Sequence, residues 1–154
     1  YDKHVAEASK EPDATARYAV NYIKSAKPNL CAVIFDNPDH VGHADGHDTP
    51  EYYNMLKVLD GYIAQIVEAV KEAGMLDDTI FIVTSDHGGI KKGHGGKTMQ
   101  EMETAFIISG KGIKNGYEFT ESMMQFDTAA TIAHIFNLKQ PQVWIGRPMV
   151  QVFK

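Results

Sequence analysis

Three runs of strand length, in which hydroxyl residues occur only at the ends, constrain the fold of this 154-residue chain most strongly. They span residues 30–35, 79–84 and 104–109. A strand with one face in water alternates polar and apolar residues, whereas a continuous apolar run is typical of a strand buried on both faces. Because helical patterns separate the runs, the sequence predicts an α/β fold: one mainly parallel sheet covered by helices.

The clearest helical pattern covers residues 50–73. Thr49, Pro50 and Glu51 supply a hydroxyl cap, a proline at the first helical position and an acid in the first turn. Apolar residues then recur at helical spacing, at Leu56, Leu59, Ile63, Ile66 and Val70. Two further helices are predicted, one from residue 13 to just before Pro28 and one from residue 127 to 136, the latter burying Ile132, Ala133 and Phe136.

Composition excludes several classes of protein. The net charge of -5 argues against binding to a nucleic-acid polymer, which normally needs a basic surface. No run of 18 apolar residues is present, so no transmembrane helix is predicted. The single cysteine, Cys31, rules out an intramolecular disulfide and is expected to pack in the core as part of the first apolar run.

Histidine and aspartate gather directly after the first two runs. Asp39 and His43 follow the first, Asp86 and His87 follow the second, and His94 comes seven residues later. In open parallel sheets, ligands bind beyond the carboxyl ends of the strands, so these side chains are expected to meet there. A divalent cation would offset the repulsion between the carboxylates. Aspartate oxygen and neutral imidazole nitrogen suit zinc, and also manganese or iron.

Other polar residues near these clusters are expected to play ordinary roles. Solvated loop positions are expected for His40, Asp45 and His47. His4 and His134 are expected to be ordinary surface or core histidines, and Ser85 a hydroxyl that helps the turn before Asp86.

Four motifs in order carry a resemblance that covers about residues 13–153. PDHVGHADG looks like the Pro-Asp-x-x-Gly-His segment of nucleotide pyrophosphatases/phosphodiesterases of the alkaline phosphatase superfamily. Residues 50–89 are similar to that superfamily's long helix, short loop and strand ending in Ser-Asp-His-Gly. GHGG with ETAFIISGKGIKNG resembles its later Gly-x-His-Gly segment, strand and Gly-x-Gly loop, and WIGRPM resembles its short tail motif.

The resemblance implies an alkaline phosphatase-like fold and a two-metal site. Asp39, His43 and His94 match the three ligands of one metal ion, and Asp86 and His87 match two ligands of the second. Both ions would be zinc, with manganese also compatible. The implied activity is metal-dependent hydrolysis of a phosphate monoester or diester through a covalent phospho-enzyme.

The chain also departs from the family pattern. The family has an N-terminal half with a strand that ends in a further metal-binding aspartate, and then a threonine or serine nucleophile. Nothing before Asp13 matches that half. Residues 1–154 are therefore expected to be the C-terminal part of one alkaline phosphatase-like domain, with no catalytic nucleophile in this chain and no activity in isolation. The resemblance leaves the compartment open and leans towards a periplasmic or secreted protein.

Several alternatives stay open. The spacing from His87 to His94 is much shorter than in the nucleotide phosphodiesterases, so a sulfatase or phosphonate hydrolase of the same superfamily also fits. Typical sulfatases, however, have Asp-Asn where this chain has Asp86-His87. A non-catalytic metal-binding module is a further reading, as is a relative of the cofactor-independent phosphoglycerate mutases. In the catalytic readings the expected partner is a small-molecule phosphate or sulfate ester.

Overall fold

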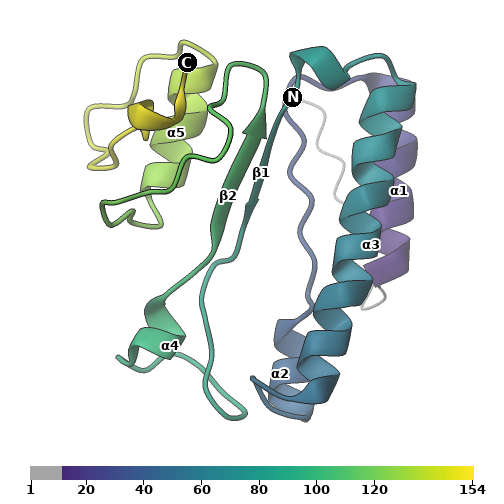
Figure 1. Cartoon of the computed structure of the whole chain (residues 1–154), viewed down its shortest axis with the longest axis vertical. Helices are drawn as coiled ribbons and strands as arrows, with labels where there is room; N and C mark the ends of the chain where they lie inside the picture. The colour runs from purple at the N-terminus through teal and green to yellow at the C-terminus, as the bar shows by residue number, and fades with distance from the viewer. Residues whose placement is uncertain (1–11) are drawn as a thin grey trace. The chain divides into compact units, whose positions relative to one another are not determined.

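The computed structural model describes residues 12–154, and these residues form two compact units (Figure 1). The first unit comprises residues 12–79 and 87–103, and the second comprises residues 80–86 and 104–154. The first holds α1 (Pro12–Ala26), α2 (Asp39–Ala44), α3 (Pro50–Glu72), η1 (Leu76–Asp78) and α4 (Met99–Met102). The second holds β1 (Ile80–Thr84), β2 (Phe106–Gly110), α5 (Asp127–Ile135) and η2 (Val150–Val152). His4 lies outside the described residues.

Helices α1 and α3 lie side by side and form the core of the first unit (Figure 1). Their inward faces carry mostly small side chains, which let two helix backbones approach closely. The buried residues are Ala14, Ala16, Ala19 and Ile23 on α1, and Leu59, Ala69 and Val70 on α3. The predicted helix over residues 50–73 is confirmed to within one residue. The Thr49 hydroxyl accepts a hydrogen bond from the Tyr52 backbone N–H at 3.3 Å, and Gly74 follows with φ of +71°.

The sheet differs from the predicted one. β1 and β2 pair antiparallel, in a register that runs from Ile80 opposite Gly110 to Thr84 opposite Phe106. The run 30–35 is extended but belongs to no ladder among residues 12–154. Apolar runs report a preference for burial and carry no information on the direction of a partner strand. Parallel neighbours are usually joined by a crossover helix, and the connection 85–105 contains only the four-residue helix α4.

The first apolar run is also less buried than expected. Leu30 is 62% and Ile34 80% exposed, and Cys31 is exposed rather than packed in the core. The core role predicted for Cys31 is therefore wrong. Because the segment pairs with no strand among residues 12–154, its apolar side chains are only partly covered.

Helix α5 is the main helix of the second unit. It ends at Ile135, and its buried residues are Asp127, Ala130, Thr131 and Ala133. Phe136, which was expected to face inward, is 39% exposed. Ala133 is buried as predicted and Ile132 is half-buried, while two polar residues, Asp127 and Thr131, take inward positions that were not predicted.

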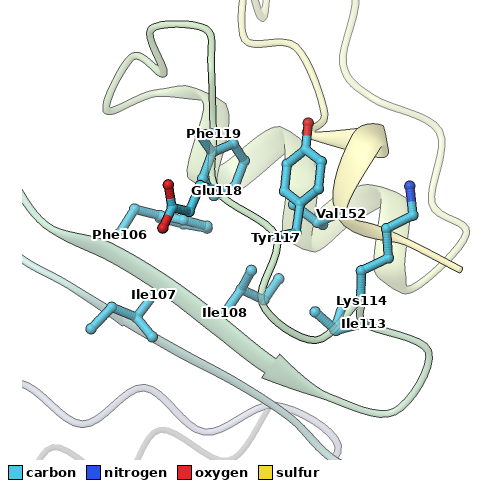
Figure 2. Close-up of a pocket in the computed structure, with 9 residues that line it drawn as sticks. All are labelled: Phe106, Ile107, Ile108, Ile113, Lys114, Tyr117, Glu118, Phe119 and Val152. Carbon is cyan, nitrogen blue, oxygen red and sulfur yellow. The ribbon is translucent and has the colours of Figure 1, made fainter.

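A hollow of about 320 Å³ lies beside β2 in the second unit (Figure 2). Its lining is mainly apolar and aromatic, and the Lys114 amine at its edge donates to the Gln151 carbonyl at 2.9 Å. None of the predicted metal ligands lines it. No helix within residues 12–154 has the length and apolar character needed to cross a membrane.

Candidate metal centre

Asp39 and His43 lie one turn apart on α2. Sequence reasoning placed this segment in a loop, but residues at i and i+4 share one face of a helix, and the structure has a helix here. The Asp39 Oδ2 atom lies 3.5 Å from the His43 Nε2 atom. The D-x-x-x-H spacing was the sequence signal that could have revealed the helix.

His94 and His87 complete the cluster in the first unit. The His94 Nε2 atom lies 3.6 Å from Asp39 Oδ1, and the His94 ring stacks on the His87 ring at 3.7 Å between centroids. One ligand atom from each of Asp39, His87 and His94 lies within 4.8 Å of the others. The His43 ring centroid is 5.0 Å from that of His94. Four of the five predicted ligands therefore come together.

The fifth predicted ligand, Asp86, belongs to the second unit, at the residue that directly precedes His87. Its role stays a prediction. So does the grouping of His87 with a second metal ion, because His87 lies with Asp39 and His94 in the same cluster.

The hydrogen bonds of two histidines determine which ring nitrogen faces the cluster. The Nδ1 atom of His43 lies 3.0 Å from the Lys92 carbonyl, and that of His87 lies 2.8 Å from the Gly88 carbonyl. A carbonyl can only accept, so Nδ1 carries the hydrogen and the neutral ring has its lone pair on Nε2. This pattern, in which the backbone orients a ring so that its other nitrogen can bind a metal, is common in metal sites.

The carboxylate of Asp39 fits a cation. Its Oδ1 atom is buried and accepts no hydrogen bond from the part of the chain that the structure describes. A buried carboxylate oxygen without a donor is unfavourable unless a positive charge approaches it. The Nε2 atoms of His43 and His94 lie 3.5 Å and 3.6 Å from the two carboxylate oxygens, and the hydrogen bond of His43 Nδ1 leaves the lone pair of its neutral ring on Nε2. The donor set of one carboxylate and several imidazoles therefore suits a divalent ion such as zinc.

The loop after His87 is held to the end of α2 by a side-chain contact, and main-chain contacts hold the loop to itself and to α4. The Lys92 ammonium donates to the Ala44 carbonyl at 2.7 Å, and Ile90 pairs with Gly93 in a short bridge. The Gly88 N–H donates to the Glu101 carbonyl at 2.9 Å. These contacts fix the segment that carries His94 relative to the helix that carries Asp39.

Glu101 organises the residues that follow His94. Its carboxylate accepts hydrogen bonds from the Gly96 N–H at 2.8 Å and from the Thr98 hydroxyl at 2.6 Å. The Thr98 bond, followed by that of Gly96, lowers the pKa of Glu101 below its ordinary value. Sequence reasoning missed this group, although Thr98-x-x-Glu101 has the capping-box spacing.

Two tyrosines at the start of α3 have raised pKa values. Burial, and after it the negative charge of Asp39, raises the pKa of Tyr52. The Tyr53 hydroxyl donates to Asp48, and that hydrogen bond raises the pKa of Tyr53.

The remaining histidines of the prediction divide into two groups. His40 is exposed, as expected, and His134 is exposed with its ring 5.2 Å from that of Phe153. His47 is not the solvated loop residue that was predicted. Its ring is half-buried and packs between two glycines of the first unit.

The family comparison decides what kind of protein contains this cluster. The model of the family "Type I phosphodiesterase / nucleotide pyrophosphatase" matches residues 1–137. The chain belongs to that family. It is therefore a member of the alkaline phosphatase superfamily, as the four motifs predicted.

Two curated relatives of this chain are named as a phosphate transferase and a sulfatase. GPI ethanolamine phosphate transferase 3 of Schizosaccharomyces pombe is 32% identical over 103 residues, which are 66% of this chain and 11% of that protein. Arylsulfatase K of Danio rerio is 26% identical over 121 residues, 70% of this chain and 23% of that protein. The chain thus spans less than a quarter of either relative.

A solved 2-O GAG sulfatase has a similar fold, with a TM-score of 0.74 and 14% sequence identity. The match covers 90% of this chain and 44% of the sulfatase. It shows that the chain forms part of an alkaline phosphatase-like α/β fold. At this identity it carries no information on substrate.

Proposed function

We propose that this chain supplies most of the metal ligands of a phosphate-ester hydrolase of the alkaline phosphatase superfamily. Asp39, His43 and His94 would hold one divalent ion, and Asp86 with His87 would contribute to a second. The observation that supports this most directly is the buried Asp39 Oδ1 atom, which lacks a hydrogen-bond donor among residues 12–154 and lies 3.6 Å from the His94 Nε2 atom.

Zinc fits the proposal better than calcium. Calcium prefers six to eight oxygen ligands, whereas the cluster offers imidazole nitrogen from three residues. Zinc accepts a mixture of imidazole and carboxylate, and manganese is the next best fit. When bound, the ions would lower the pKa of the attacking group and offset charge on the ester oxygens.

The residues of this chain would bind and orient the ions rather than attack the substrate. The Lys92 and Gly88 carbonyls hold His43 and His87 so that Nε2 of each is the nitrogen without a hydrogen. We propose that the nucleophile lies on a segment outside the 154 residues. A phosphate monoester or diester is the proposed substrate class.

A sulfate ester is the second candidate. It is favoured by the similarity to Arylsulfatase K. The His87 imidazole weighs against a calcium-type sulfatase, since nitrogen is a poor ligand for calcium.

Metal binding tests the proposal in two parts. The 154-residue chain should bind about one zinc ion by elemental analysis after dialysis, and Asp39→Asn should abolish that binding. Asp45→Asn, which changes an exposed carboxylate just after α2, is the matched control and should bind zinc as the parent does. Absence of zinc and manganese binding by the parent chain would overturn the proposed site.

Turnover is tested in a longer protein that carries the rest of the fold. It should hydrolyse p-nitrophenyl phosphate or bis-p-nitrophenyl phosphate faster than p-nitrocatechol sulfate. His43→Ala or Asp86→Ala should lower kcat by several orders of magnitude, because each removes a predicted metal ligand. A preference for the sulfate would select the second candidate. Zinc binding without turnover of any substrate would identify a non-catalytic module.

A further inference from the structure

We propose that His47 is a positioning residue, whose ring sets the spacing between the two segments that carry the metal ligands. One segment is α2, with Asp39 and His43, and the other is the loop from His87 to His94. The inference rests on the proposed function, because the side chains that His47 would position are the proposed ligands.

Two glycines make room for the His47 ring, one on each segment. A Cβ atom added at Gly42 of α2 would lie 2.5 Å from His47 Nε2, and one added at Gly89 of the loop would lie 2.1 Å from the same atom. Both distances are far shorter than any non-bonded contact. Neither glycine has a positive φ, so backbone conformation does not require glycine at either place. The space that the His47 ring occupies is what requires glycine at both places.

The other edge of the ring is bonded to the loop. His47 Nδ1 lies 3.0 Å from the Lys91 carbonyl, and the His47 backbone N–H donates to the same oxygen. The Tyr52 ring packs at 5.3 Å between centroids. The Nδ1 side of the ring is therefore bonded to the loop, and its Nε2 side occupies the space left free by the two glycines. It cannot turn aside for a larger residue without losing the bond to Lys91.

This placement connects His47 to a proposed ligand through adjacent carbonyls. The Lys91 carbonyl accepts a hydrogen bond from His47 Nδ1, and the next carbonyl, that of Lys92, accepts one from His43 Nδ1. A shift of the loop away from α2 would loosen the bond that fixes which His43 nitrogen faces Asp39. It would also move His94, which follows two residues after Lys92. His47 itself is no ligand of the cluster, because one ring nitrogen faces a carbonyl and the other faces glycine backbone.

Steric rescue tests the inference in the 154-residue chain loaded with cobalt(II), whose visible absorption reports the geometry of its ligands. Gly89→Ala should weaken cobalt binding 10-fold to 100-fold, the usual effect of disturbing residues that support metal ligands. His47→Ala should weaken it by a similar factor. In the double variant the methyl group added at position 89 occupies space that the ring has left, so Gly89→Ala should cause little further loss.

Gly93→Ala is the matched control. Gly93 lies in the same loop, has an ordinary φ, and a Cβ there would meet nothing within 4 Å. Its cobalt affinity should equal that of the parent. His47→Asn keeps a donor near the Nδ1 position without the distal edge of the ring, so it should restore part of the affinity that His47→Ala loses.

The spectrum at saturating cobalt separates positioning from general stability. A residue that only stabilises the fold would change the affinity but leave the saturated spectrum as in the parent. A positioning residue would change the spectrum as well, and we expect a changed spectrum for Gly89→Ala and His47→Ala. If the parent binds cobalt and Gly89→Ala matches Gly93→Ala, the inference is wrong while the proposed function stands. If the parent binds neither cobalt nor zinc, the proposed function fails and the inference with it.

Discussion

Replacing Asp127 by alanine should destabilise the second unit by about 3–4 kcal/mol. Asp127 is only 1% exposed, and its carboxylate accepts two backbone hydrogen bonds. Oδ2 accepts from the Met124 N–H at 2.9 Å and Oδ1 from the Arg147 N–H at 2.7 Å. It therefore connects the start of α5 to the C-terminal Gly146-Arg147-Pro148 segment.

The magnitude follows from these two bonds. A hydrogen bond to a charged group contributes about 1.5–3 kcal/mol, and a buried donor left without an acceptor costs about 1–3 kcal/mol. Alanine would remove both acceptors. Arg147 is exposed, so water can replace part of the second hydrogen bond. The total loss for the two bonds therefore lies near the lower end of the range that they allow. Asparagine keeps one acceptor oxygen at nearly the same volume and should cost about half as much.

Urea unfolding followed by tryptophan fluorescence measures this loss. Trp144 is the chain's single tryptophan and lies in the second unit. With a slope of about 1.5 kcal/mol per molar urea, a loss of 3 kcal/mol lowers the midpoint by about 2 M. Thr128→Val is the control, because the Thr128 hydroxyl on the same helix has no partner among residues 12–154. Equal midpoints for Asp127→Ala and Thr128→Val would refute the reasoning.

Two further predictions concern the first unit. The hydrogen bonds that lower the pKa of Glu101 stabilise its loop above the ordinary glutamate pKa, and this contribution should be lost as the pH falls through the lowered value. A carboxyl carbon titration by NMR should therefore give a Glu101 midpoint below the ordinary one in the parent, and a midpoint closer to the ordinary one in Thr98→Val. Zinc at about 100 times its Kd should raise the free energy of unfolding by about 2.7 kcal/mol, measured by circular dichroism, and His94→Ala should abolish the gain. Stabilisation of His94→Ala equal to that of the parent would place the ion elsewhere.

Local signals predicted the helices of this chain better than its sheet. The Thr49 cap, the proline after it and the spacing of Leu59 and Val70 are all determined within one segment, and α3 begins and ends within a residue of the expected positions. The direction of β1 relative to β2 depends on the path of residues 85–105, which an apolar run does not encode. The run 30–35 shows the same limit, because burial depends on partners that a segment cannot specify alone.

The candidate site divides in a similar way. Residue types and their order were enough to nominate Asp39, His43, His87 and His94, since few other roles account for so many imidazoles near carboxylates. The supporting residues were missed because their contribution comes from contacts between segments that lie far apart in the sequence. Lys92 binds the Ala44 carbonyl through its ammonium and holds His43 through its own carbonyl, and neither contact has a signature in the sequence around it.

Three histidines of the first unit share one hydrogen-bond pattern, and yet we propose different roles for them. His43, His47 and His87 each have Nδ1 within 3.0 Å of a main-chain carbonyl between residues 88 and 92. Each neutral ring therefore presents Nε2 on its far side. For His43, that side faces the Asp39 carboxylate, and for His47 it faces two glycines. What surrounds Nε2 then decides whether an imidazole can bind an ion or only separate two segments. Gly42 and Gly89 create that neighbourhood for His47, whereas the Asp39 carboxylate supplies it for His43.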